Sequence, residues 1–264
     1  MGLKNKLKEK IAEGKTVFGS WAMIPSPMVA NVMAESGIDF LIADLEHGPI
    51  SLETLENMIY ATEAGGSTLI ARLPNSTDEE ILKVLEVGTQ SIMMSHVKNL
   101  ETASRFGRAT QYPPSGSRGL SPFTRNHKYS DDQIAQKMIE ANANIFTGVL
   151  VEGAEGLDAL EEISNLENLD MIYFGIYDLA SSMGIPGELD NPNLVEKLKK
   201  SIEIVKANGK VAGTVATNLQ RIGFYKEIGF NFIAYKNDTS LLMQSISAGV
   251  SEFKKCRRIH CEQV

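Results

Sequence analysis

The sequence is poor in cysteine, which removes one kind of metal centre from consideration. Only two cysteines occur among 264 residues, and both lie in the segment CRRIHC, residues 256–261. A zinc site there would have His260 as its third ligand, but the spacing is irregular and the segment is terminal. We therefore interpret Cys256 and Cys261 as incidental thiols.

An excess of basic residues is also absent. Lys and Arg total 26 against 33 Asp and Glu, which gives a formal net charge of -7. A protein that grips phosphate backbones needs a broad basic face, so this balance argues against a nucleic-acid partner.

Long apolar runs are missing as well. No run reaches the ~20 residues that cross a bilayer. The first residues, MGLKNKLKEKIAEGK, are charged where a signal peptide would need an apolar segment. These features predict a cytoplasmic protein without a membrane partner.

Short apolar runs, by contrast, recur along the whole chain. With 43% hydrophobic and 22% charged residues, the composition suits one large domain over residues 1–264. Eight runs are typical of buried β-strands. They are TVFGSWA (16–22), DFLIADL (39–45), STLIARL (67–73), QSIMMSH (90–96), NIFTGVLVE (144–152), DMIYFG (170–175), KVAGTVA (210–216) and NFIAYK (231–236).

Segments of helical periodicity lie between these runs. Clear examples are 51–64, 77–87, 193–208 and 219–228, with caps expected at Ser51, Thr77 and Gly209. Eight alternating units of buried strand and helix predict an α/β fold, a closed (βα)8 TIM barrel. An open doubly wound sheet is the alternative, but the glycine-rich nucleotide motifs that accompany it are absent.

Active sites of such barrels lie at the carboxyl ends of the strands. Ten polar residues end or follow the predicted strands: Asp44, Glu46, His47, Arg72, Ser95, His96, Glu152, Asp178, Thr214 and Lys236. The longest irregular segment, 112–130, is rich in Pro, Gly and Ser, and we expect it to overhang the mouth of the barrel.

The residue types at these positions suggest enolate chemistry. Glu152 and Asp178 suit a hard divalent cation such as Mg²⁺ or Mn²⁺, whose remaining sites water and a 2-oxo acid would fill. Arg72 offers a planar fork for a carboxylate or enolate oxygen. His47 is the natural proton acceptor near neutral pH, and Asp44 could orient its ring.

Structural roles for the same residues remain open at this point. Asp44 and Glu46 could cap the following helix, and Arg72 could pair with surface acids. Asp178 could cap its own turn. We interpret His96 and His127 as structural, because neither has a carboxylate partner in its own segment.

At these residues the sequence resembles the HpcH/HpaI aldolase family of metal-dependent pyruvate aldolases. The resemblance extends from FGSW (18–21) to DTSLL (238–242). Its strongest pieces occur in the order of the family. They are DLEHGP (44–49), ARLP (71–74), LEVGTQSIMM (85–94), YPPSGSRG (112–119), VLVE (149–152) and FGIYDLASSMG (174–184).

The resemblance implies an enzyme that cleaves 2-oxo-3-deoxy acids into pyruvate and an aldehyde, using Mg²⁺, Mn²⁺ or Co²⁺. His47 would be the base, paired with Asp44, and Arg72 would bind pyruvate and its enolate. Glu152 and Asp178 would hold the metal ion.

The resemblance also implies a homo-oligomer, typically a hexamer. The site would lie near subunit contacts, and a C-terminal helix within residues 238–264 would pack on a neighbour. Glu86 matches the acid that supports His47 from an adjacent subunit.

Four positions depart from the family pattern. Leu150 replaces a common Gln, and Glu86 replaces a usual Asp. Tyr177 adds bulk between Gly175 and Asp178, where backbone N–H groups would meet the pyruvate carboxylate. Lys236 replaces a usual small residue near the last strand.

Three alternatives stay open. Lys236 could form a Schiff base with the substrate carbonyl. The chain could be a related lyase of acyl-CoA substrates. It could also be a barrel that has lost turnover and binds a small acid or a partner protein.

Overall fold

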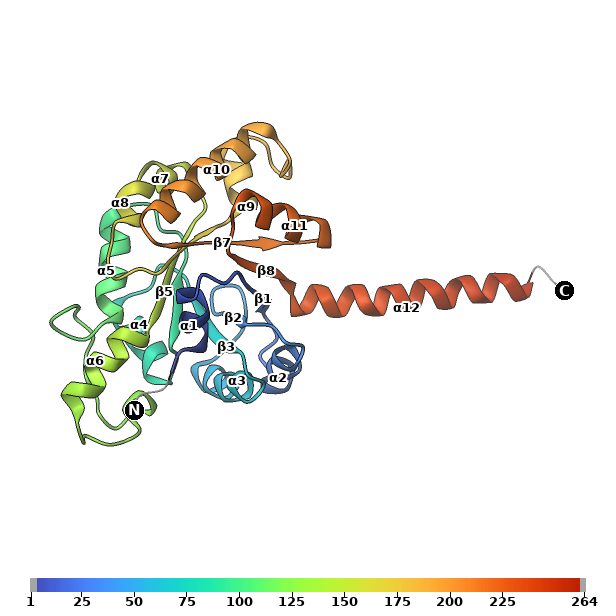
Figure 1. Ribbon diagram of the computed structural model, residues 1–264. Coiled ribbons are helices and arrows are strands. Elements are labelled where there is room, and N and C mark those ends of the chain that lie inside the picture. The colour runs from blue at the N-terminus through green and yellow to red at the C-terminus, as the bar shows by residue number, and fades with distance from the viewer. Residues whose placement is uncertain (1–3, 262–264) are drawn as a thin grey trace.

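A computed structural model describes the backbone of residues 4–261 and the side chains of residues 4–255 (Figure 1). Eight parallel strands form a closed barrel in sequence order. They are β1 (Val17–Ala22), β2 (Phe40–Asp44), β3 (Thr68–Leu73), β4 (Ser91–Met94), β5 (Phe146–Val151), β6 (Met171–Phe174), β7 (Val211–Ala216) and β8 (Phe232–Asn237). Each predicted run corresponds to one strand, and only β8 extends beyond its run, by the single residue Asn237, so the predicted TIM barrel is confirmed.

Helices surround the barrel (Figure 1). They are α1 (Lys6–Ala12), α2 (Pro27–Glu35), α3 (Leu52–Ala64), α4 (Asp78–Glu86), α5 (Leu100–Thr110), α6 (Ile134–Asn144), α7 (Ala154–Asp158), α8 (Leu160–Ser164), α9 (Ile176–Ser182), α10 (Pro192–Ala207), α11 (Leu219–Ile228) and α12 (Asp238–Cys261), with a 3-10 turn, η1 (Arg125–His127). Ser51 caps α3, and Thr77 forms a capping box with Glu80 at the start of α4. The four predicted helices are all present.

The barrel interior is filled by alternate residues of the strands. Phe40 and Phe232 stack there with ring centroids 3.9 Å apart. Gly19 makes room for this pair, because a Cβ at residue 19 would lie 2.2 Å from the Phe40 carbonyl oxygen. The inward positions become polar only toward the carboxyl ends, so the apolar interior forms a floor beneath a polar mouth.

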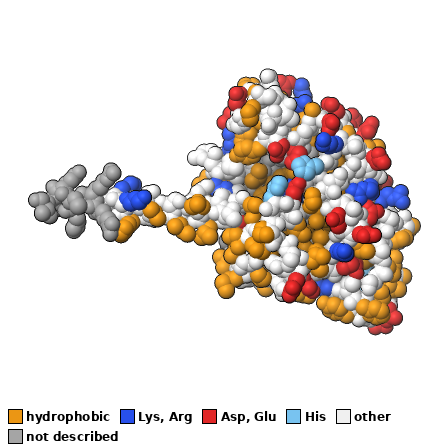
Figure 2. Space-filling view, turned by 180° about the vertical axis from the view of Figure 1, so that it is seen from behind, with side chains coloured by type: hydrophobic (Ala, Val, Ile, Leu, Met, Phe, Trp, Pro, Cys, Tyr) orange, Lys and Arg blue, Asp and Glu red, His pale blue; other side chains and the backbone are white. Residues whose placement is uncertain are grey.

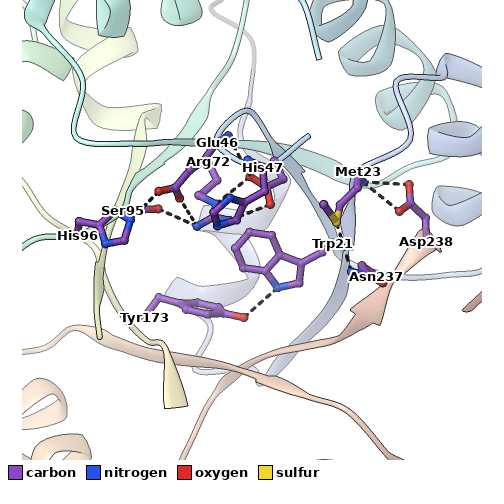
Figure 3. Close-up of polar contacts among 11 residues, drawn as sticks. Trp21, Met23, Glu46, His47, Arg72, Ser95, His96, Tyr173, Asn237 and Asp238 are labelled. Carbon is purple, nitrogen blue, oxygen red and sulfur yellow. Dashed lines mark hydrogen bonds and ion pairs between the residues drawn. The ribbon is translucent and has the colours of Figure 1, made fainter. Parts of the chain in front are cut away.

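The barrel closes where its first and last strands meet. β8 carries an extra residue relative to β1 beyond Gly19, a β-bulge at Tyr235 and Lys236. Asp238, directly after β8, accepts backbone N–H groups of Met23 at 3.0 and 3.1 Å and of Ile24 at 2.9 Å (Figure 3). This buried carboxylate joins the segment after β1 to the start of α12.

The long irregular segment does not overhang the mouth, and that prediction is wrong. Its Asn126 side chain donates to the Leu85 carbonyl at 2.6 Å, and Arg125 pairs with Glu63. Leu85 lies near the carboxyl end of α4, and Glu63 lies near the carboxyl end of α3. These helix ends lie on the amino-terminal side of the barrel. The reason is the connection: the segment follows helix α5 and not a strand, so it begins on the side opposite the site.

Helix α12 projects away from the barrel (Figure 1). It carries large apolar side chains that are 47–67% exposed, namely Leu242, Met243, Ile246, Val250 and Phe253. The side chains of Cys256, His260 and Cys261 lie outside the described residues. Within the described residues, no helix combines the length and apolarity needed to span a membrane.

His127 is structural, as predicted. It is fully buried, and its Nε2 shares a hydrogen bond of 2.8 Å with the Tyr112 hydroxyl. Burial lowers the pKa of His127, since a charged imidazole would lose its hydration there.

We expect acid to destabilise the fold through His127. The unfolded chain takes up this proton at about pH 6.5, whereas the folded chain does so only at lower pH. Stability is therefore retained above that pH and falls below it, by at most ~1.4 kcal/mol per pH unit. The free energy of unfolding, measured with urea between pH 8 and pH 5, should fall less steeply with decreasing pH for His127→Asn than for the wild type. Equal slopes would contradict this assignment.

Candidate active site

A cavity of about 660 Å³ opens at the carboxyl ends of the strands. Its charged or titratable lining residues come from nearly all sides of the barrel: Asp44, His47, Arg72, His96, Glu152, Tyr173, Tyr177, Asp178 and Lys236. Figure 2 shows histidine and acidic side chains lying next to each other on one face. The structure thus brings together most of the predicted strand-end residues.

Asp44 and Arg72 form the centre of this lining. They are directly opposed in the register of β2 and β3, so both side chains point into the barrel at the same level. Arg72 donates from Nε to Asp44 Oδ1 at 3.0 Å and from Nη2 to Oδ2 at 2.8 Å. Their side chains are only 8% and 5% exposed, so this is a buried bidentate ion pair.

The remaining donors of Arg72 are largely occupied too. Nη1 donates to Ser95 Oγ at 3.0 Å and pairs with Glu46 (Figure 3). The guanidinium also lies over the Trp21 ring, 5.0 Å from its centroid. An arginine has five N–H groups. One N–H of Nη2 therefore has no acceptor among the described residues and can face the cavity.

The expected contact of Asp44 with the His47 ring is replaced by another arrangement. Asp44 Oδ1 accepts the backbone N–H groups of Glu46 and His47, each at 3.0 Å. The carboxylate therefore shapes the turn that carries His47 while its oxygens also bind Arg72. The His47 side chain is exposed at the cavity mouth.

His96 lines the cavity, although the sequence analysis interpreted it as a structural residue. Its Nε2 lies 2.7 Å from Glu46 Oε1 (Figure 3), and its Nδ1 contacts Glu152. The carboxylates come from other strands, which a search of its own segment could not find. His96 also has a left-handed backbone, φ +57°, a conformation that residues with a Cβ seldom adopt outside functional sites and turns.

Glu152 and Asp178 both line the cavity. Burial raises the pKa of Glu152, and the negative charges of Asp178 and Glu46 raise it further against the effects of His96 and Arg72. Gly175 is required beside Glu152, because a Cβ at residue 175 would lie 2.8 Å from the Glu152 Cβ.

The donor set suits a divalent cation that also binds substrate. Four carboxylates, those of Asp44, Glu46, Glu152 and Asp178, stand against two cationic side chains, Arg72 and Lys236, at the cavity and its edge, so negative charge is in excess. The described residues contain no ready-made cluster of three or more metal-binding side chains. Mg²⁺ and Mn²⁺ often use only one or two carboxylates and take their other ligands from water and substrate.

The cavity floor contains residues that the sequence analysis missed. Trp21 Nε1 donates to the Tyr173 hydroxyl at 3.1 Å, and the two rings pack edge to face (Figure 3). Burial raises the pKa of Tyr173, so its hydroxyl keeps its proton and can donate into the cavity. Leu150 lies beside Tyr173 in the strand register and closes the floor with an apolar side chain. Every second side chain of a strand points into the barrel, and this alternation along β1 and β6 is the signal that could have identified Trp21 and Tyr173.

Tyr177 lies at the rim. Its hydroxyl donates to Thr217 Oγ1 at 3.0 Å, and the side chain is 42% exposed. Gly175 precedes α9, and Asp178 falls in the first turn of that helix. Tyr177 thus lines the cavity together with Gly175 and Asp178, and its hydroxyl is held by Thr217.

Glu86 lies apart from this cavity. It ends α4 and pairs with the buried Arg118, Nη2 to Oε1, at 2.8 Å. Its other carboxylate oxygen is buried without a hydrogen-bond partner among the described residues. At the carboxyl end of α4, Glu86 therefore lies on the side of the barrel opposite the cavity.

Comparison with known proteins decides the family. The model of the HpcH/HpaI aldolase/citrate lyase family matches residues 18–245. The chain belongs to this family.

Similar proteins match along their whole length. A hydroxypyruvate/pyruvate aldolase of Roseovarius nubinhibens is 30% identical, covering 95% of this chain and 97% of the relative. A 2-keto-3-deoxy-L-rhamnonate aldolase of Salmonella gallinarum is 30% identical, covering 97% and 96%. The crystal structure of the citrate synthase SbnG superposes with a TM-score of 0.86 at 30% identity, covering 96% and 98%. The HpcH/HpaI membership expected from the sequence is confirmed, and the relatives support the predicted enzyme class.

The buried ion pair of this HpcH/HpaI family member should contribute strongly to stability. Asp44→Ala leaves Arg72 buried with its main partner removed, so we expect a loss of about 3–5 kcal/mol in the free energy of unfolding. Asp190→Ala is the control, because the Asp190 carboxylate, which pairs with Arg221, is 83% exposed. That variant should lose about 1 kcal/mol or less. Similar losses in the two variants, measured by urea unfolding at pH 7, would contradict this role.

Proposed function

We propose that the chain is a divalent-metal-dependent aldolase that cleaves a 4-hydroxy-2-oxo acid into pyruvate and an aldehyde. One observation carries the proposal: a single arginine and an excess of carboxylates surround a cavity at the carboxyl ends of the strands. The aldolase names of full-length relatives support the same reaction.

Glu152 and Asp178 would hold the metal ion, Mg²⁺, Mn²⁺ or Co²⁺. When bound, it would supply Lewis-acid polarisation of the 2-oxo group and stabilise negative charge. His96 contacts Glu152 in this structure and would hold that carboxylate in the orientation that binds the metal ion.

Arg72 and Tyr173 would bind the 2-oxo acid from the protein side. The fork of Arg72 is already bound by Asp44, so the substrate receives the free N–H of Nη2 and not a bidentate pair. The Tyr173 hydroxyl, which accepts from Trp21, would donate its own proton to a substrate oxygen. The substrate thus meets donors that are held in place before it arrives.

His47 would transfer the proton. Its exposed imidazole takes the proton from the C4 hydroxyl, the C3–C4 bond breaks, and its electron pair remains on the pyruvate half as an enolate. The C4 carbon leaves as the aldehyde carbonyl. Protonation of the enolate at C3 completes pyruvate.

A homo-oligomer would complete the site, and a hexamer is the form that we propose. The exposed apolar side chains of α12 would pack on a neighbouring subunit. Glu86 would then support His47 of an adjacent subunit, a role that its position within one subunit does not allow.

Removal of the metal ion should abolish activity. Exhaustive chelation should stop pyruvate release from 2-oxo-3-deoxy acids, and Mg²⁺, Mn²⁺ or Co²⁺ should restore it. Glu152→Gln should weaken Mn²⁺ binding by at least about 10-fold, measured by electron paramagnetic resonance of the free ion. Full activity after chelation, with borohydride trapping at Lys236, would instead establish the Schiff-base mechanism.

Loss of the proton acceptor should affect turnover and not the metal ion. We expect His47→Ala to lower kcat by about 10²–10⁴-fold, while Mn²⁺ affinity and the unfolding midpoint stay near the wild-type values. Lys226→Met, at an exposed position of α11 away from the cavity, serves as the control and should keep kcat. Wild-type kcat in His47→Ala would rule out the assigned role.

Citrate formation is a second candidate, favoured by the 30% identity with the citrate synthase SbnG. Both reactions pass through an enolate, so the residues above do not separate them. Product analysis does: pyruvate from 2-oxo-3-deoxy acids supports the aldolase, and citrate from oxaloacetate and an acetyl thioester supports the synthase.

A further inference from the structure

Lys236 is a feature of the cavity that the proposed chemistry leaves unused. It lies near the end of β8, two residues after the inward-facing Ala234, and lines the cavity. The bulge at Tyr235 and Lys236 interrupts the alternation of side chains along that strand, and Lys236 lines the cavity within this bulge. A long cationic side chain thus lines the same cavity as Asp44 and Arg72.

The backbone is shaped to place this side chain. Lys236 has a left-handed conformation, φ +52°, within the bulge between β1 and β8. The Ser20 hydroxyl donates toward the carbonyl oxygens of Tyr235, at 2.8 Å, and Lys236, at 3.3 Å. A residue with a Cβ adopts this conformation only where its surroundings impose it, and bulges commonly redirect side chains beside active sites.

The ammonium group has no carboxylate partner among the described residues. It contacts the Gln244 side-chain oxygen from α12, and it lies 5.1 Å from the Tyr235 ring centroid. An ammonium can only donate, so the Gln244 oxygen faces it and the amide N–H groups of Gln244 are left for another acceptor. Gln244 also lines the cavity. One ammonium and one amide thus converge on the same space.

We propose that Lys236 and Gln244 form a subsite for a second carboxylate of the substrate, so that the enzyme prefers dicarboxylic 2-oxo compounds over their monocarboxylic analogues. This inference rests on the proposed function, which places the 2-oxo acid group of the substrate at Arg72. A cavity of about 660 Å³ leaves room beyond a three-carbon acid. The single positive charge and the amide match the charge and two oxygens of a carboxylate, whereas a phosphate dianion would need more donors.

Binding tests the subsite without relying on turnover. Calorimetry with Mg²⁺ present would compare 2-oxopentanedioate with 2-oxopentanoate, and 2-oxohexanedioate with 2-oxohexanoate. In the wild type the better-fitting diacid should bind about 10-fold more tightly than its monoacid. In Lys236→Met this ratio should approach one through loss of diacid affinity, and Gln244→Leu should lower it partly. Lys226→Met should keep the wild-type ratio.

The possible failures are distinguishable. Equal binding of both acids in a wild type that releases pyruvate would overturn the subsite and leave the aldolase intact. A diacid preference that depends on Lys236, in a protein without aldolase turnover, would support the subsite and reject the aldolase. No binding of any of the four acids, or a preference unchanged in Lys236→Met, would overturn the subsite.

Discussion

The site depends on the register between β2 and β3, which opposes Asp44 to Arg72 at the end of the barrel. A guanidinium buried to this degree needs a carboxylate, and Asp44 meets both ends of its fork. The same carboxylate holds the backbone of the His47 turn, so one side chain positions the cation and the proposed base. A slip of one residue would turn both groups away from the cavity.

Neighbouring groups extend this ion pair into a chain of charges. Glu46 joins Arg72 to His96, and His96 joins Glu46 to Glu152. The chain crosses from β2 to β5, so a change in the charge of one group alters the surroundings of the proposed metal ligand. The excess of carboxylates would be unfavourable without a cation, which is why the arrangement favours a metal-dependent reaction.

Much of the fold and about half of the site could be predicted from the sequence. Strand runs, helix periodicity and caps such as Thr77 are local signals, and local signals were sufficient to predict the barrel and to place Arg72, Glu152 and Asp178 at its cavity. The contacts of His96 were not predicted, because its partners Glu46 and Glu152 follow other strands. The segment 112–130 was misplaced because its length says nothing about whether it follows a strand or a helix.

Closure of the barrel ties the two ends of the chain together. The backbone N–H groups after β1 find their acceptor in Asp238, more than 200 residues later in the sequence. Contacts of such separation form late, since a long loop must close before they are made. During synthesis on the ribosome, the early strands must wait for the last strand before the cavity exists. Shorter nascent chains expose an unfinished barrel edge, and such an edge needs protection from aggregation.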